Sequence, residues 1–479
     1  MEIIIIFISL IIVSAICFFI KYRGTIEVCS ILSSGVALVG SIIVAIKVAE
    51  IGSYTRYGIF YVDALGAITM LIIGLIGFVT TIYSIQYLHQ ETTKNIIGFH
   101  RVKQFFTLLN IFLLAMFLAI TASSPIFAWI SIEATTLSTA FLISFYNKPS
   151  AIEGAWKYLI INSIGLILGF FGTLLYFTSV SSSNTELINW QLLADKAVHL
   201  DPMLAKIAFV FILIGYGTKI GLVPMHTWKP DAYSKAPAPL GALLSGALLP
   251  VAFTIVMKFK IITDIAVGDL FSKNLLIVFG ILSIGIATLI MFNARNYKRL
   301  LAYSSIENAG LITLGFGLGG FGVFAATFHL IFHSCIKAIL FFSSGNLLLK
   351  YNSSKINRIK GALSVVPFTS ILFIIGFLIL TGMPPFGIFF SKMLILSVGI
   401  KTNPIVTILV IIFTTIVFVG FLKHVTKMFF GKKTDDVTVG EVSDWLLFSP
   451  TLLLVIVFCL SFYLPSFLSK LINMVSLTY

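Results

Sequence analysis

The chain has 479 residues, of which 58% are hydrophobic and only 10% are charged, and its mean hydropathy is +1.07. A soluble domain carries about 25% charged residues, so the composition excludes an ordinary soluble enzyme and is typical of a polytopic membrane protein. The net charge of +14 therefore indicates basic loops at a membrane surface and no binding of nucleic acid.

The apolar segments predict an all-α fold of about fourteen transmembrane helices, each near the roughly 20 residues that cross a bilayer. Met1 and Glu2 lead directly into the first segment without a basic stretch, so we expect a retained helix and no cleaved signal peptide. In chain order the segments are 2–20, 28–49, 62–86, 104–121, 125–145, 158–180, 203–223, 240–262, 274–292, 300–319, 321–348, 363–398, 404–428 and 447–469.

Basic residues are unevenly distributed among the predicted loops. Most of the 32 Lys and Arg residues follow odd-numbered segments, as Lys21, Lys229, Lys298 and Lys432 do. Because loops rich in Lys and Arg stay in the cytoplasm, we expect a multi-pass protein of the cell (inner) membrane with both termini extracytoplasmic.

Gly and Pro interrupt two of the predicted helices, the seventh at Gly221-Leu-Val-Pro224 and the twelfth at Gly382-Met-Pro-Pro385. Broken helices at matching positions of inverted repeats mark ion paths in transporters, whereas ordinary proline kinks are the alternative. We predict four regions: N-terminal helices in 1–103, a unit of about five helices in 104–262, an inverted unit of about five in 274–430, and a C-terminal helix in 447–479.

Glu133 and Lys219 are ionisable residues inside apolar segments. Glu133 is the only acid in its segment, and Lys219 lies near the end of the seventh. A lysine at bilayer depth costs roughly 2.5–3.5 kcal/mol on insertion scales, which indicates a function. We predict that the two residues pair across a helix interface and pass a proton; a static ion pair is the alternative.

A second group is His329, His333 and Lys337, which we call the histidine–lysine row. Their i, i+4, i+8 spacing places them on one face of a helix. Histidine titrates near neutral pH, so the row predicts a proton relay. Haem ligation is an alternative, but it normally uses histidines from facing helices.

Other titratable residues are candidates for accessory roles. Lys392 follows the second break and is either the last relay or a side chain that snorkels to the interface. Glu307 either neutralises the histidine–lysine row or bonds locally. His226 and Asp231, near Pro224, are entry groups or simply interfacial.

The four cysteines lie in apolar segments and form no Cys-x-x-Cys pair. This pattern argues against iron–sulfur clusters and structural zinc. We therefore expect no metal, no other cofactor and no catalytic residue in this chain.

Five runs together resemble a known family, the antiporter-like subunits shared by respiratory complex I, Mrp-type antiporters and membrane-bound [NiFe] hydrogenases. Among its branches the chain looks most like hydrogenase-4 component F. The runs are Trp129–Glu133, Gly217–Ala232 with Ala236–Pro239, Lys298–Glu307, His329–Gly345 and Gly382–Phe386.

The resemblance implies roles for the candidate residues. Glu133 and Lys219 match the glutamate–lysine pair of the first half-channel, the histidine–lysine row matches the central relay, and Lys392 matches the basic group on the second broken helix. Pro250 stands where many relatives carry a lysine, so water or another group must connect the halves. The long lateral helix of the most distal complex I subunit is missing, so we do not expect that subunit.

The resemblance also implies a proton-translocating subunit of a redox-driven complex, with the hydrogenase type first. A quinone-reducing NADH dehydrogenase or an Mrp-type antiporter is the alternative. The expected partners are other membrane subunits and the lipid bilayer. A stand-alone secondary transporter for Na⁺ would need acid-rich binding cages, whereas the ionisable residues inside the segments are mostly basic.

Overall fold

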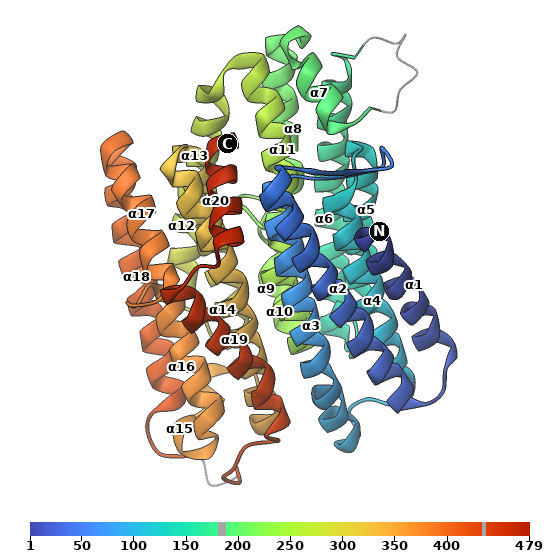
Figure 1. The fold of residues 1–479 in the computed structure, drawn as a ribbon. Helices are drawn as coiled ribbons and strands as arrows, with labels where there is room; N and C mark the ends of the chain where they lie inside the picture. The colour runs from blue at the N-terminus through green and yellow to red at the C-terminus, as the bar shows by residue number, and fades with distance from the viewer. Residues whose placement is uncertain (181–187, 434–436) are drawn as a thin grey trace.

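The computed structural model describes residues 1–180, 188–433 and 437–479 (Figure 1). These residues form a bundle of helices with one small hairpin. Twelve of the described helices are long and apolar enough to cross a membrane. The prediction of an all-α, multi-pass membrane protein is therefore confirmed, while the number of crossings and the inverted repeat stay predictions.

The first part of the chain contains six long helices and, between α2 and α3, a β-hairpin that the hydropathy pattern did not predict. Asp63 ends the hairpin and caps the third helix by accepting from Gly66 N at 2.7 Å. The elements are α1 (Glu2–Phe19), α2 (Arg23–Ile51), β1 (Tyr54–Arg56), β2 (Phe60–Val62), α3 (Ala64–Thr93), α4 (Phe99–Thr121), α5 (Pro125–Ile143) and α6 (Pro149–Phe177).

The middle of the chain contains the first break and a distorted helix. Pro250 lacks an N–H, and its ring clashes with the carbonyl four residues earlier in a regular helix; a π-helical turn precedes it and widens the ladder. The elements are α7 (Trp190–Lys196), η1 (Ala197–His199), α8 (Pro202–Ile220), α9 (Trp228–Lys235), α10 (Ala238–Leu243), the π turn η2 (Leu244–Leu248) and α11 (Leu249–Val267).

The last part of the chain contains the second break. The final predicted segment, 447–469, is not one continuous helix. That segment ends at Phe462, and a separate helix begins after Pro465, because proline is tolerated at a helix start and not in its interior. The elements are α12 (Asp269–Met291), α13 (Tyr297–Leu318), α14 (Phe321–Tyr351), η3 (Ile356–Arg358), α15 (Ala362–Val365), α16 (Pro367–Thr381), α17 (Gly387–Thr402), α18 (Pro404–Phe429), α19 (Trp445–Phe462) and α20 (Ser466–Thr478).

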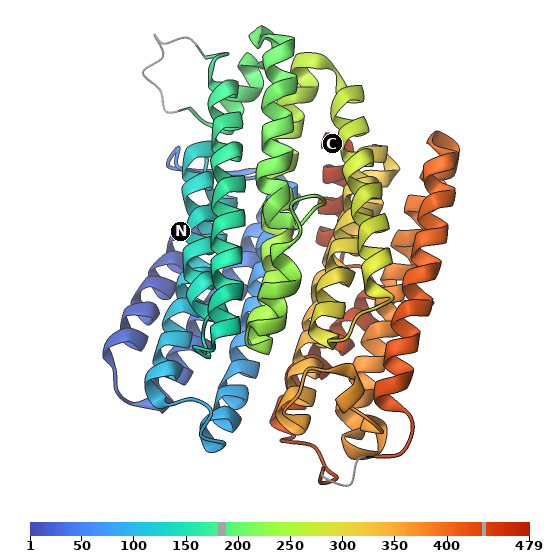
Figure 2. The same ribbon diagram turned by 180° about the vertical axis from the view of Figure 1, so that it is seen from behind.

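Helices differ in how far they lie inside the bundle. The most apolar window of α14 is 89% buried, and that of the stretch from α10 to α11 is 100% buried, whereas α18 and α19 are only 28% buried (Figures 1 and 2). The histidine–lysine row lies on α14. Its side chains are therefore inside the protein and not in contact with lipid.

Both chain termini lie at the end of the bundle that carries the β-hairpin (Figure 1). The Met1 amino group donates to Tyr54 Oη at 3.4 Å, and Tyr479 Oη donates to Asp63 Oδ2 at 3.5 Å. The termini are therefore on the same side, and which side of the membrane that is stays a prediction.

Both predicted breaks interrupt their helices. Helix α8 ends at Ile220 and is followed by Gly221 at φ 81°, and α16 ends at Thr381 and is followed by Gly382 at φ 97°. This left-handed backbone is favourable only for glycine. Each break also contains a cis peptide bond before a proline, Pro224 or Pro385. The chain leaves the helix at both sites, so the alternative of ordinary kinks is wrong.

Helices α6 and α8 approach so closely that backbone meets backbone. A Cβ on Gly215 of α8 would lie 2.5 Å from the Cα and N of Gly169 on α6, whereas a Cβ on Gly217 would meet only Leu222, at 3.6 Å. Small residues at such interfaces let membrane helices pack tightly. This contact positions Lys219, which lies one turn further along α8.

We expect Gly215→Ala to destabilise the protein and Gly217→Ala to be neutral or slightly stabilising. The first change overpacks the interface, which costs about 1–3 kcal/mol, and the second adds a favourable helix residue in open space. Thermal unfolding of the purified protein in detergent measures both. Equal melting temperatures for the two variants would contradict the close packing of α6 on α8.

Candidate functional site

Lys219 is buried on α8 among hydroxyl groups. Its Nζ donates to Tyr158 Oη at 3.0 Å and lies 3.4 Å from Thr135 Oγ1. Tyr158 in turn shares a hydrogen bond of 2.7 Å with Thr139. The amine is thus connected to α5 and α6 through groups that both donate and accept protons.

Glu133 does not pair directly with Lys219. Its carboxylate accepts from Ser163 at 2.9 Å and from Thr136 at 3.2 Å, whereas Lys219 contacts Thr135. Residues two apart on a helix point to different sides. Glu133 therefore faces α6, whereas Thr135 faces Lys219. The predicted direct ion pair is therefore not formed in the described structure, and its static alternative fails with it.

The histidine–lysine row is fully buried on one face of α14. The rings of His329 and His333 have centroids 6.4 Å apart. Lys337 donates to the carbonyl of Leu301 at 2.9 Å and to Ser304 Oγ, both on α13. The ring nitrogens of His333 have no hydrogen-bond partner in the described part of the chain. The predicted alignment on one face is thus present.

His329, Asn308 and Glu307 are hydrogen-bonded in sequence, and Glu307 lies within ion-pairing distance of Lys392. His329 Nε2 bonds Asn308 Oδ1 at 3.0 Å, Asn308 Nδ2 donates to Glu307 Oε2 at 2.5 Å, and Lys392 Nζ lies 3.8 Å from Glu307 Oε1. Ser391 Oγ forms a hydrogen bond with the other ring nitrogen, His329 Nδ1, at 2.9 Å. With both nitrogens engaged, His329 has none free for a haem iron.

Lys392 points back into the second break and does not snorkel. Its Nζ donates to the carbonyls of Leu380 and Thr381, at 3.1 and 3.4 Å, and its side chain is 11% exposed. These carbonyls end α16 and have no partner in their own helix. Glu307 therefore pairs with Lys392 and accepts a hydrogen bond from Asn308, and it forms no direct contact with Lys337.

Lys229 holds the corresponding position at the first break, and reasoning from the sequence misses it. Its Nζ donates to the carbonyl of Ile220 at 2.5 Å, and it is fully buried. The polar segment around it predicts a cytoplasmic loop, and that prediction is wrong for this residue. The sequence does contain a signal for this position. Lys229 follows Gly221 by eight residues, and Lys392 follows Gly382 by ten.

Lys229 lies on a helix that touches both halves, because α9 packs against α6 and against α13. The π turn before Pro250 places Ser245 2.8 Å from Ser305 on α13. A polar contact therefore joins the helix that carries Pro250 to α13, although Pro250 occupies the expected lysine position.

Lys298 is a second lysine that the sequence assigns to a loop and that the structure buries. Lys298 is 2% exposed and donates to the carbonyl of Ala236 at 3.1 Å, whereas its neighbour Arg299 reaches the surface. Asp231 accepts a hydrogen bond from Lys157 at 3.2 Å and forms an ion pair with Arg299 at 3.4 Å, which joins α6, α9 and α13 at the surface. Its position fits the interfacial alternative. His226 lies half-buried in the first break.

Buried bases outnumber buried acids among the described residues. The buried acids are Glu91 and Glu307, and the buried lysines are Lys219, Lys229, Lys258, Lys260, Lys298 and Lys337. Each unpaired buried charge costs several kcal/mol. Lys260 is paired with Asp264 at 2.5 Å, whereas a proton on one of the other lysines disfavours protonation of any lysine close to it.

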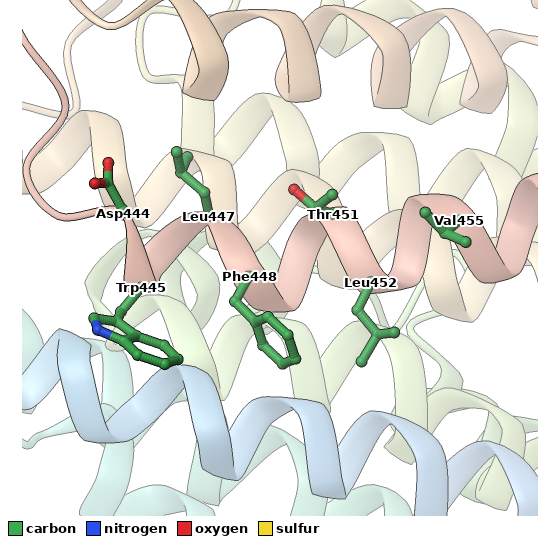
Figure 3. A pocket seen from close by; sticks show the side chains of 7 residues that line it. All are labelled: Asp444, Trp445, Leu447, Phe448, Thr451, Leu452 and Val455. Carbon is green, nitrogen blue, oxygen red and sulfur yellow. The ribbon is translucent and has the colours of Figure 1, made fainter.

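A pocket of about 510 Å³ along α19 is not a candidate site (Figure 3). Its lining comes from this one helix, and Trp445, Phe448 and Leu452 project from the same side of it (Figure 3). Asp444 is the only ionisable residue in the lining. An apolar groove of this kind on an outer helix faces lipid.

Two sequence profiles match the chain. The profile described as NADH:quinone oxidoreductase/Mrp antiporter, TM covers residues 122–418, and that of the complex I chain 5 N-terminus covers residues 50–96. The chain belongs to this antiporter-like family. The matched region contains both breaks, Lys219, Lys229 and the histidine–lysine row, so the sequence-based resemblance is confirmed.

Individual relatives agree with the family. The hydrogenase-4 component F homolog of Methylacidiphilum infernorum is 35% identical over 378 residues, which are 78% of each chain. One Na⁺/H⁺ antiporter protein of Alkalihalophilus pseudofirmus is 28% identical over 83% of this chain, but the match spans only 52% of that protein. The chain likewise spans about half of the chloroplast NAD(P)H-quinone oxidoreductase subunits 5 that it matches.

The fold is shared with a solved complex. A chain of the membrane-bound sulfane sulfur reductase, an archaeal respiratory membrane complex, superposes with a TM-score of 0.88 over 100% of this chain and 96% of its own. The sequence identity is 21%. At that identity the likeness supports the fold alone.

Proposed function

We propose that this member of the antiporter-like family translocates protons as a membrane subunit of a redox-driven complex of the [NiFe] hydrogenase type. The observation that carries the proposal is the buried chain His329–Asn308–Glu307–Lys392, which links the row on α14 to the second break. Every member of this chain can donate or accept a hydrogen bond. Burial isolates the chain from lipid, so its exchange of protons involves other groups inside the protein.

In the first half the path runs from Glu133 to Lys219. Each group is bonded to hydroxyl groups of α5 and α6, the carboxylate to those of Thr136 and Ser163 and the amine to those of Thr135 and Tyr158. Hydroxyl groups pass a proton by accepting one and releasing another. The proposal therefore needs no direct contact between Glu133 and Lys219.

Lys229 connects the two halves in this proposal. It lies at the first break on α9, which packs against α6 and α13. In this proposal a proton on Lys229 makes protonation of Lys337 on α14 less favourable, because like charges repel. Electron transfer in a partner subunit would start this sequence of shifts, and Lys392 would release the proton.

The hydrogenase type is preferred because of the extent of the likeness. The component F homolog matches at 35% identity over 78% of both chains, whereas the antiporter and quinone-reductase relatives match over about half of their lengths. The proposed partners are hydrogenase subunits and other membrane subunits. An NADH:quinone oxidoreductase or an Mrp-type antiporter is the second candidate, since relatives of both kinds share the fold and the motifs.

We expect Lys337→Ala to reduce proton pumping by at least about 100-fold, the lower end of what a positioned proton donor contributes. Inside-out vesicles with the intact complex measure the pH gradient, and electron transfer is followed in the same sample. Lys350→Ala, on the same helix but at its exposed end, is the control. Normal pumping by an assembled Lys337→Ala complex would overturn the relay.

Substitutions of Lys229 distinguish a relay from a structural cap. Lys229→Arg can keep the bond to the Ile220 carbonyl, but arginine does not give up its proton in proteins. We expect the arginine variant to assemble yet pump at least about tenfold less, and Lys229→Met to lose pumping as well. If Lys229→Arg pumps at the wild-type rate, Lys229 only caps α8.

The identity of the complex is tested by purification through an affinity tag on this chain. We expect nickel, iron and a hydrogenase large subunit to co-purify, and hydrogen oxidation or evolution to be detected. A flavin-containing NADH dehydrogenase in place of nickel would favour the second candidate. A chain that purifies alone and exchanges Na⁺ for protons in vesicles would contradict the redox assignment.

A further inference from the structure

A basic pocket of about 1080 Å³ lies where α12 and α18 end, outside the proposed proton path. Its lining combines side chains from α9, the segment before α13, the loop after α14, and the last two turns of α18. Six cations and no acid line it, namely Lys235, Arg295, Arg299, Lys355, Lys423 and Lys427. Asparagine side chains add further polar groups to the wall.

Most of this positive charge is not neutralised by ion pairs within the part of the chain that the structure describes. Arg299 pairs with Asp231 at 3.4 Å, but none of the other five cations forms an ion pair with a described residue. Lys423 lies over the ring of Phe292, with its Nζ 4.6 Å from the ring centroid, which holds the amine at the pocket wall. A cluster of this kind attracts an anion.

The pocket continues into an apolar surface in the direction of the bilayer. Helices α12 and α18 lie side by side (Figure 2) and are both long and apolar enough to cross a membrane. On them Leu289, Phe292, Val419 and Leu422 are all more than one third exposed. The basic cluster is thus at the depth of lipid headgroups, and the adjoining surface is at the depth of acyl chains.

We propose that this pocket binds the phosphate headgroup of an anionic phospholipid, whose acyl chains lie along α12 and α18. Basic pockets between helices on the cytoplasmic side are known to hold such headgroups. The lipid is preferred over an acidic segment of another protein because the site joins a cationic cluster directly to an exposed aliphatic surface. Only an amphiphile with a charged end and an apolar end satisfies both parts.

Lys423 and Lys427 are the residues to test, because they lie one turn apart on α18 and contact none of the proposed proton-path residues. The full-length chain in detergent is titrated with phosphatidylglycerol, and bound lipid is counted by native mass spectrometry. Each lysine near an anionic lipid contributes about fivefold in affinity. We expect Lys427→Gln to lose about fivefold and Lys423→Ala with Lys427→Ala about 25-fold.

The controls separate a built site from general surface charge. Lys21→Ala with Lys103→Ala removes the same charge far along the chain and is expected to leave binding within about twofold, since the effect of a charge falls off within a Debye length. Phosphatidylcholine is expected to show no difference between any of the variants. Unchanged binding by the Lys423/Lys427 variant, or an equal loss in the control, would overturn the proposal.

Two further outcomes identify other occupants. If millimolar inorganic phosphate displaces the lipid, the site recognises a free anion and the lipid assignment is wrong. If the purified complex carries no tightly bound phospholipid although the single chain binds it, another subunit covers the pocket, which also overturns the proposal. Retention of phosphatidylglycerol by the wild-type complex, and its loss from the variant, supports the site.

Discussion

The structure depends on how the protein satisfies the carbonyl groups that α8 and α16 leave free at their breaks. Inside a bilayer each unsatisfied backbone group costs several kcal/mol, and an isolated buried ammonium is also costly. Lys229 and Lys392 reduce both costs at once, because each ammonium binds the carbonyls at the end of the preceding half-helix. A titratable amine is thereby fixed at each break.

The two breaks have different surroundings, and this difference shapes the proposed path. Near the second break a histidine, an amide and a carboxylate are hydrogen-bonded in sequence, and the carboxylate lies 3.8 Å from Lys392. Near the first break Lys219 is surrounded by hydroxyl groups, and the nearest candidate acid, Glu133, is bonded elsewhere. Lys219 therefore bonds neutral hydroxyl groups, whereas Lys392 has a carboxylate within ion-pairing distance.

The sequence predicted the long apolar helices, both breaks and the burial of the histidine–lysine row. The length of an apolar segment indicates a membrane-crossing helix, and a glycine followed closely by a proline indicates where a helix is interrupted. It did not predict the β-hairpin or the division of the segment 447–469. Lys229 was missed because α9 is short and polar, so its composition resembles a loop even though the fold buries it. The expected Glu133–Lys219 pair failed because the rotation of α5, which decides the face of Glu133, depends on packing that a single sequence does not contain.

The central claim is that both halves form one path, and a double-mutant comparison of pumping stoichiometry tests it most directly. Protons per electron would be measured in inside-out vesicles for Lys219→Ala, Lys392→Ala and the double variant, with assembly and electron transfer verified in each. For groups in series, we predict that either single variant abolishes this chain's contribution and that the double variant loses no more. A partial loss in each single variant, with the two losses adding in the double variant, would show two independent paths and contradict the account.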